Sequence, residues 1–267
     1  MYIGTAGVPI GCKNCSSLDA LKFLKDANLN ALELEFVRGV KMGEENAKRI
    51  KNRAEDLDIR ISSHAPYYIN LASDDPQKLQ RSLEHIKKSL YITNLAGGHI
   101  TAIHMGYYQN LGKEETYRRM KNALESLVEF IEQHNIKTKM GPETAGKLSQ
   151  FGRLQEILRL AEEVPYTEPV FDIAHLHATR EYDFTKKDEY YRFFNDAPMD
   201  HYHFHFSEIN YGEKGERNHL NVGETLEPNY KYFLEVLKEL GIKATIVLET
   251  PDLEESAKKL LEYWKTL

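Results

Sequence analysis

Strand-like and helix-like segments alternate along the whole chain, and this alternation limits the possible folds more than any other feature. Eight segments carry the β-branched or alternating apolar residues typical of strands, at 2–7, 31–36, 59–64, 100–105, 136–143, 169–175, 201–206 and 244–250. Segments of helical period lie between them, and another closes the chain. Strict alternation implies parallel strands with helical crossovers, and eight such units close into a barrel. The sequence therefore predicts an α/β chain with a single (β/α)8 barrel over residues 1–267.

Local signals mark the starts of two helices. Ser17 or Asp19 can cap the first helix, because both side chains accept hydrogen bonds from free backbone N–H groups. Asp74 and Asp75 precede Pro76 at the start of the third helix, where proline is well tolerated.

Composition is that of one globular domain without a membrane segment. The chain has 267 residues, of which 41% are apolar, enough for one substantial core. No window approaches the roughly 18 consecutive apolar residues that span a bilayer, and no signal segment precedes the first strand. We expect a soluble, cytoplasmic monomer with no membrane partner. Cys12 and Cys15 are too few for a disulfide framework or an all-cysteine zinc site, and they are either ordinary loop cysteines, a redox pair or a stray metal contact.

The net charge does not settle whether the chain binds nucleic acid. A net charge of −6 argues mildly against a protein that coats nucleic acid, since affinity for phosphates normally comes from a basic surface. Metal ions in one cleft would add positive charge that the formal count omits. A localised nucleic-acid site therefore remains compatible with the composition.

Acidic residues or histidines end six consecutive predicted strands. They are His64, His104, Glu143, Asp172 with His175, His205 and Glu249. The carboxyl ends of parallel strands meet on one face of a barrel, so these side chains are expected to converge. A single histidine at a strand end is more often structural, and His177, His201 and His203 are interpreted in this way.

Convergence of so many acids and imidazoles favours a metal centre. Burying several carboxylates among imidazoles costs several kcal/mol each unless a cation compensates. Imidazole and carboxylate ligands without thiolate suit zinc, with manganese or iron as alternatives. The ligands are too many for one tetrahedral ion, and a carboxylate such as Glu143 could bridge two ions. Two ions holding a hydroxide between them suit attack on a phosphodiester.

The segment after the seventh strand adds two further candidate ligands. This glycine-punctuated segment, residues 209–224, carries Glu216 and His219, and His219 is the better candidate. The alternative is a solvated polar turn.

Taken together, these motifs resemble the endonuclease IV family of apurinic/apyrimidinic endonucleases, within the xylose isomerase-like barrels. The resemblance rests on SHAPYYINLAS around His64, PETAG around Glu143, FDIAH with Asp172 and His175, and VGE followed by LET at Glu249. It implies a metal-dependent hydrolase of DNA repair that cuts the phosphodiester 5′ to an abasic site in double-stranded DNA, leaving a 3′-hydroxyl.

The resemblance also implies roles for individual residues. A centre of roughly two to three zinc ions is implied, with manganese as the alternative metal. One ion takes His64, His104 and Glu143; a second takes the bridging, catalytic Glu143 with Asp172, His205 and Glu249; a third takes His175 and His219 with a carboxylate. Arg38, Tyr67 and Tyr68 fall where the family contacts DNA at the extruded abasic nucleotide, and extrusion costs least where the base is missing.

One position departs from the family pattern. The family places an aspartate two residues before the histidine that matches His219, and here that residue is Arg217, with Glu216 one step further back. Either the loop shifts and Glu216 serves as the ligand, or the third ion is weakly held or absent.

Two other functions remain open. Glu143, Asp172, His205 and Glu249 also form the kind of set that holds one manganese or cobalt ion in sugar isomerases and epimerases of this fold. The additional histidines would then be acid–base residues or would support the ligands. A non-catalytic barrel that binds damaged DNA is the third alternative, since one scaffold supports unrelated functions.

Overall fold

The chain forms two compact units, each with its own core. The computed structural model describes residues 1–267. Unit 1 comprises Met1–Leu32, Gly146–Leu148 and Phe171–Leu267, and unit 2 comprises Glu33–Ala145 and Ser149–Val170. The expectation of one domain stays a prediction. No helix is both long enough and apolar enough to cross a membrane.

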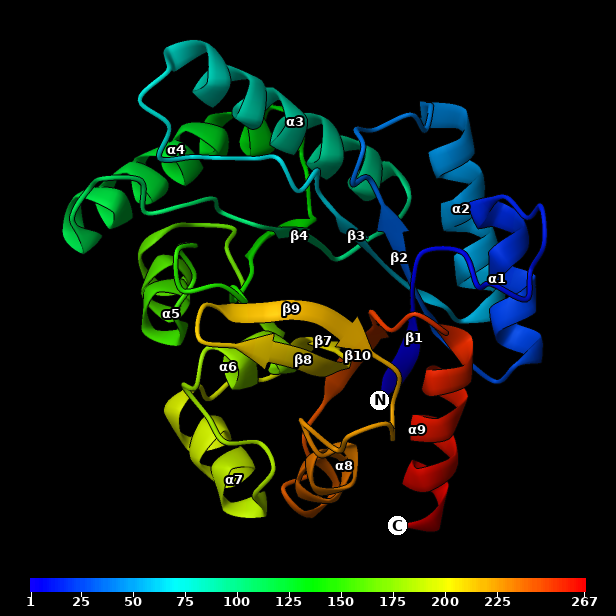
Figure 1. Ribbon diagram of the computed structural model, residues 1–267. Helices are drawn as coiled ribbons and strands as arrows, with labels where there is room; N and C mark the ends of the chain where they lie inside the picture. Colours follow the sequence, from blue (N-terminus) through cyan, green and yellow to red (C-terminus); the bar gives the residue numbers. More distant parts are fainter. The chain divides into compact units, whose positions relative to one another are not determined.

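Eight strands form a sheet in the order β5-β4-β3-β2-β1-β10-β7-β6. Their bounds are β1 Tyr2–Ala6, β2 Ala31–Glu35, β3 Arg60–His64, β4 Ile100–Ile103, β5 Lys139–Pro142, β6 Val170–Asp172, β7 Tyr202–Phe206 and β10 Ala244–Leu248. The pairs β1–β10, β10–β7, β3–β4 and β4–β5 are parallel. At least one helix lies between each strand of this sheet and the next in the sequence (Figure 1). The predicted alternation is confirmed, and with it the α/β fold class of the (β/α)8 barrel.

Nine helices complete the chain. They are α1 Ser17–Asp26, α2 Glu44–Leu57, α3 Pro76–Leu95, α4 Lys113–Gln133, α5 Leu154–Glu163, α6 Ile173–Ala178, α7 Lys187–Asp196, α8 Tyr230–Glu239 and α9 Glu254–Thr266. Asp75 caps α3 as expected, and its side chain accepts from Gln77 N and Lys78 N. The predicted cap of α1 was wrong by one residue. Ser16 is the N-cap, and the Asp19 carboxylate accepts from Ser16 N at 3.0 Å in a capping box.

The sixth strand is shorter than the sequence indicates. It ends at Asp172, and α6 begins at the next residue, so His175 lies on a helix rather than at a strand end. The cause is the Asp172 side chain, whose Oδ1 accepts from His175 N at 2.7 Å and caps the helix. Asp172, which was expected only as a metal ligand, therefore also ends β6.

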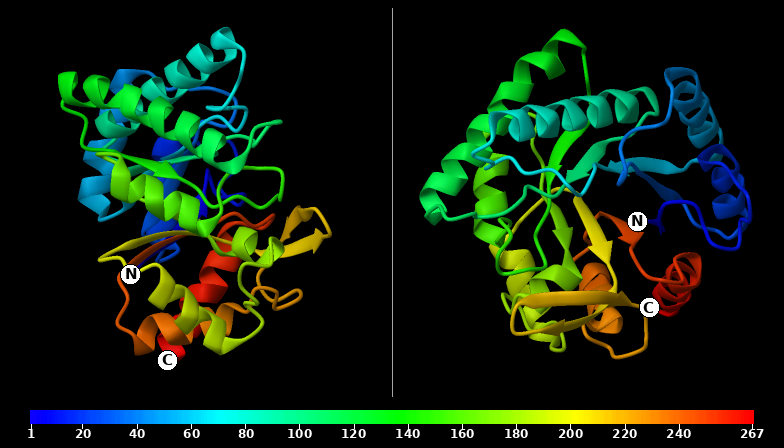
Figure 2. Two further views of the ribbon diagram at one scale, coloured as in Figure 1. Left: turned by 90° about the vertical axis from the view of Figure 1, so that its left-hand side faces the viewer. Right: turned by 45° about the horizontal axis from the view of Figure 1, so that its top comes forward.

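Two elements differ from the sequence expectation for the region from α6 to α8. The glycine-punctuated segment forms a hairpin of β8 Glu208–Gly212 and β9 Gly215–Leu220, which contacts α6 (Figure 2). Helix α7 was not predicted, although its buried Tyr190, Phe193 and Phe194 follow helical spacing.

Each unit packs around side chains of its own. In unit 2, α4 places Met120, Leu124 and Leu127 on one buried face, and α3 packs beside it (Figure 1). In unit 1 the core is aromatic, and Phe204 of β7 packs edge-to-face on Phe233 of α8 with ring centroids 5.1 Å apart. These cores hold rigid the strands that carry the candidate ligands.

Candidate metal centre

Each predicted metal ligand lies on a strand, directly after one, or on the short helix α6. Unit 2 holds His64 at the end of β3, with His104 and Glu143 directly after β4 and β5. Unit 1 holds the others: Asp172 at the end of β6, His175 on α6, His205 on β7, Glu216 and His219 on β9, and Glu249 directly after β10. Two clusters result, one in each unit.

In unit 2 two imidazole nitrogens meet one carboxylate oxygen. His64 Nε2 lies 3.1 Å from Glu143 Oε2, and His104 Nε2 lies 3.0 Å from the same oxygen. The two rings are perpendicular, with centroids 4.8 Å apart. Glu143 and His64 are buried, and His104 is partly exposed. The three side chains therefore converge as the sequence predicted.

The hydrogen bond of His64 to the backbone determines which of its nitrogens can bind a metal. His64 Nδ1 lies 2.7 Å from the carbonyl oxygen of Ala65, which can only accept, so Nδ1 carries the proton. In the neutral ring Nε2 then has a lone pair that faces the Glu143 carboxylate. Two lone pairs at this distance repel each other unless a cation or a proton lies between them.

A divalent ion would satisfy all three ligand atoms at once. Ligands about 2.0 Å from a tetrahedral zinc ion lie about 3.3 Å from one another, close to the separations from Glu143 Oε2. The residues present therefore fit a metal ion.

In unit 1 a second cluster forms around Asp172, His175, Glu216 and His219. Asp172 Oδ2 lies 3.5 Å from His175 Nδ1, and His175 Nε2 lies 3.5 Å from Glu216 Oε2. Glu216 Oε1 lies 3.8 Å from His219 Nε2. These separations are too long for good hydrogen bonds and leave room for an ion between the ligand atoms.

His219 repeats the arrangement found at His64. Its Nδ1 donates to the carbonyl oxygen of Glu249 at 2.8 Å, which places the lone pair on Nε2. This Nε2 atom is buried and has no hydrogen-bond partner. A buried polar atom left unsatisfied costs free energy, and metal coordination by a ring whose other nitrogen binds a carbonyl is a common remedy.

A β-bulge explains how Glu216 reaches this cluster. Asn210 pairs with Asn218, but the next pair in the hairpin is Tyr211 with Glu216, so Arg217 is an additional residue in β9. In a regular strand, side chains alternate, so two residues three positions apart point to opposite faces. One additional residue between them shifts this alternation, and the two side chains then point to the same face. Glu216 and His219 therefore point to the same side, and Arg217 is exposed.

Glu249 lies between two histidines of unit 1. Its Oε1 lies 3.3 Å from Nδ1 of the fully buried His205, and its Oε2 lies 3.7 Å from His219 Nδ1. All the predicted ligands of unit 1 therefore have another predicted ligand as a neighbour.

The predicted DNA-contacting residues are exposed on loops of unit 2. Tyr67 and Tyr68 follow β3, and their side chains are 56% and 52% exposed, which is unusual for rings of this size. Arg38 follows β2 and is also exposed. Unlike the candidate ligands, these three side chains are free to meet a large partner.

Two of the histidines interpreted as structural, His177 and His201, each have a hydrogen-bond partner, whereas His203 lies among possible ligands, near Glu33 and His205. His177 Nδ1 accepts from Phe184 N at 3.2 Å, and burial lowers the pKa of His177, which keeps the ring neutral. His201 Nε2 lies 2.9 Å from Thr245 Oγ1.

Sequence reasoning left one feature open and missed another. Cys12 and Cys15 form a disulfide in the loop after β1. Gly146 in the PETAG motif lies against the unit 1 cluster, where a Cβ atom would be 2.6 Å from His175 Cδ2 and 2.7 Å from Glu216 Oε2. The glycine of this motif was a signal for close approach, since only a residue without a side chain fits there.

Comparison with known proteins identifies the family of this chain. The model of the xylose isomerase-like TIM barrel family matches residues 21–267. An uncharacterized protein of Methanocaldococcus jannaschii is 35% identical over 100% of this chain and 98% of its own length. A protein of Mycoplasma genitalium named probable endonuclease 4 is 32% identical over 43% of this chain and 40% of its own length.

Solved structures share the fold. Endonuclease IV from Thermus thermophilus superposes with a TM-score of 0.72 at 15% identity, covering 94% of this chain and 95% of its own. A D-tagatose 3-epimerase-like protein has a TM-score of 0.71 at 20% identity, covering 94% and 92%. At such identities the likeness shows the fold alone. Since the family model matches residues 21–267, this chain belongs to the xylose isomerase-like TIM barrel family, and it resembles endonuclease IV members of that family.

Proposed function

We propose that this chain is a zinc-dependent endonuclease that hydrolyses the phosphodiester 5′ to an abasic site in double-stranded DNA. The observation that carries the proposal is the meeting of His64 Nε2 and His104 Nε2 on one oxygen of Glu143. Endonuclease 4 relatives support the reaction class. A role in base excision repair follows from that reaction.

The ligands of unit 2 would hold one ion and those of unit 1 one or more others. Bound divalent ions supply Lewis-acid activation of water and neutralise the charge of a phosphodiester. The protein keeps the imidazoles oriented, because the carbonyls of Ala65 and Glu249 hold Nδ1–H of His64 and His219. Manganese is the alternative metal for these oxygen and nitrogen ligands.

Exposed side chains favour a large substrate over a free sugar. Six large hydrophobic residues are exposed on loops that follow strands: Ile10, Tyr67, Tyr68, Tyr107, Leu148 and Leu226. A small polar substrate is usually enclosed by its pocket, whereas exposed aromatic rings can stack on bases. These loops therefore suit DNA.

A sugar isomerase or epimerase is the second candidate. What favours it is the residue types on or directly after four strands, Glu143, Asp172, His205 and Glu249, which are the types that hold one manganese or cobalt ion in such enzymes. A sugar enzyme with one ion would leave two contacts unexplained. The partly exposed His104 points its Nε2 at Glu143, and His175 and His219 lie on either side of Glu216.

Metal analysis paired with an incision assay tests the proposal directly. We expect roughly two to three zinc ions per chain and incision of a duplex with one abasic site that a chelator abolishes and added zinc restores. A single manganese or cobalt ion without incision would support the sugar enzyme. Tight binding of abasic DNA without incision would support the non-catalytic alternative.

Glu143→Ala should remove the shared acceptor of His64 and His104. We expect incision to fall by at least about a hundredfold and zinc content to drop, because two imidazoles alone hold zinc weakly. Circular dichroism should show an intact fold. Glu168→Ala, which removes an exposed carboxylate of the same unit, is the matched control. Near-normal incision by Glu143→Ala would contradict the role of this carboxylate.

Tyr67→Ala should weaken binding to abasic DNA roughly tenfold, since stacking contributes about 1–3 kcal/mol per base. Zinc content should stay unchanged, because the ring is exposed and Tyr67 is not a predicted ligand. The affinity is measured by titrating metal-loaded protein into a labelled duplex that carries an abasic analogue the protein does not cut. Tyr232→Ala on α8 serves as the control, and equal affinity of Tyr67→Ala and parent would rule out DNA contact by this ring.

Glu216→Ala tests the carboxylate that the bulge delivers. The zinc content is expected to fall by roughly one ion per chain, because His175 and His219 lose their common carboxylate neighbour. Elemental analysis after dialysis gives the readout. Glu213→Ala in the exposed turn of the same hairpin should keep the parent's zinc content, and full zinc in Glu216→Ala would show that another ligand holds this ion.

A further inference from the structure

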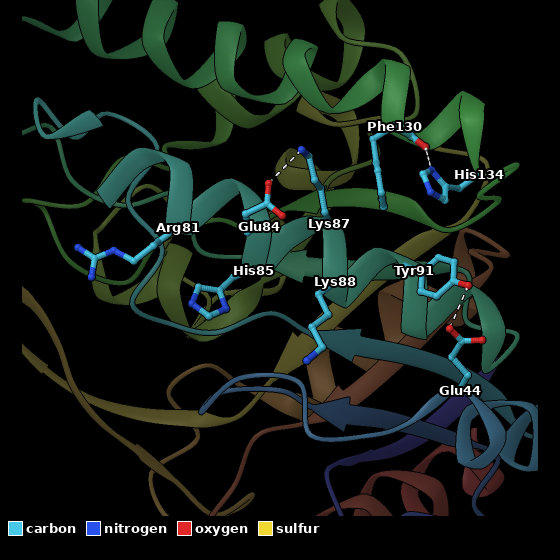
Figure 3. Close-up of a pocket in the computed structure, with 9 residues that line it drawn as sticks. All are labelled: Glu44, Arg81, Glu84, His85, Lys87, Lys88, Tyr91, Phe130 and His134. Carbon is cyan, nitrogen blue, oxygen red and sulfur yellow. Dashed lines mark hydrogen bonds and ion pairs between the residues drawn. The ribbon is translucent and has the colours of Figure 1, made fainter. Parts of the chain in front are cut away.

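A basic and aromatic surface on unit 2 has no role in the metal centre. It includes part of a pocket between α2, α3 and α4, drawn in Figure 3. Arg81, His85 and Lys88 of α3 line this pocket and are spaced by four and three residues, which places them on the same side of the helix. Glu84 and Lys87 of the same helix also line the pocket, and Figure 3 shows them paired with each other.

The two cations on this side of α3 are available for an anion. Arg81 and Lys88 are exposed and form no ion pair, and Arg81 Nε donates only to the carbonyl oxygen of Gln77 at 3.3 Å. By contrast, the acidic groups of the pocket have partners. Glu84 pairs with Lys87 at 3.1 Å, and Glu44 accepts from the Tyr91 hydroxyl at 3.3 Å.

Aromatic contacts connect this side of α3 to the loop that carries His64. The ring of His85 packs edge-to-face on Tyr68 with centroids 5.0 Å apart, and Tyr68 contacts Tyr67 at 6.0 Å. The turn at Arg38 borders the same ring, since a Cβ on Gly39 would lie 3.4 Å from the Tyr68 hydroxyl. A continuous strip therefore runs from the turn after β2, through the two tyrosines, to α3.

The strip is locally positive in a chain whose net charge is negative. Burial and the nearby cations Lys88 and Arg81 lower the pKa of His85. Cations without partners beside exposed rings are the combination that binds the phosphates and bases of a nucleic acid strand.

We propose that the part of this strip on α3, formed by Arg81, His85 and Lys88, binds the sugar–phosphate backbone of the DNA strand flanking the lesion, beyond the contacts predicted for Arg38, Tyr67 and Tyr68 at the lesion itself. The proposal rests on the proposed function and extends it. Seven residues of helix separate Arg81 from Lys88, a rise of about 10 Å. One strand of B-DNA advances about 3.4 Å per nucleotide, so the two cations span about three nucleotides and can contact two phosphates.

Salt-dependent binding to two duplexes tests the strip. Both carry one abasic analogue; the long duplex extends well beyond the lesion, and the short one ends within about three base pairs of it. For Arg81→Ser/Lys88→Ser on the long duplex, we expect affinity to fall roughly tenfold and the slope of log K against log salt to shrink by about 1.8. On the short duplex its affinity should equal the parent's.

The control is Lys231→Ser/Lys238→Ser on α8, which removes two exposed lysines with the same spacing of seven residues. This variant should keep the parent's slope on both duplexes. Incision of the short duplex by the parent reports on the proposed function separately. If the parent protein incises the short duplex but Arg81→Ser/Lys88→Ser has the parent's salt slope on the long duplex, the role of the strip is overturned and the proposed function is not.

The remaining outcomes also decide between the two proposals. A parent that binds but does not incise, with a strip variant of reduced slope, supports the strip and contradicts the endonuclease. A parent that binds neither duplex at low salt overturns both.

Discussion

A backbone carbonyl next to a strand end holds the Nδ1 proton of two candidate ligands, and the geometry of both clusters depends on this bond. The carbonyl of Ala65 orients His64 in unit 2, and that of Glu249 orients His219 in unit 1. Each bond places a lone pair on Nε2, which faces the buried carboxylate of Glu143 in unit 2 and the partly exposed carboxylate of Glu216 in unit 1. Since strand ends are fixed by sheet hydrogen bonds, the barrel scaffold itself determines which ring atom is presented to a metal.

In the proposed nuclease the two clusters and the exposed loops would have different tasks. Buried acids and imidazoles at strand ends are rigid and can hold ions, whereas the tyrosines after β3 are exposed and can adapt to a large substrate. Tyr67 follows His64 by only three residues, so one short segment changes from a candidate ligand to a surface contact. This close coupling makes the segment after β3 the part of unit 2 where DNA binding would most directly affect the metal centre.

Much of the fold and the positions of most candidate ligands could be predicted, because the carboxyl ends of parallel strands meet on one face and functional side chains gather there. Glu143 and Glu249 directly follow β5 and β10, and the bounds of α2, Glu44–Leu57, match its helical segment. Local hydrogen bonding explains the errors. Asp172 caps α6 and ends β6 early, which moves His175 onto a helix, and periodicity alone cannot reveal this. The disulfide of Cys12 and Cys15 depends on loop geometry that spacing does not determine.

Glu216, the candidate carboxylate of the third ion, shows how a strand accommodates one additional residue before His219. In an unbulged β9, a glutamate three residues before His219 would face away from it. The bulge at Arg217 returns Glu216 to the side of His219, but a longer side chain than aspartate then needs space. Gly146 supplies that space, because any Cβ there would overlap Glu216 and His175. The bulge at Arg217, the longer side chain of Glu216 and the missing side chain of Gly146 therefore depend on one another. Substituting Gly146 would disturb the cluster as directly as substituting a ligand.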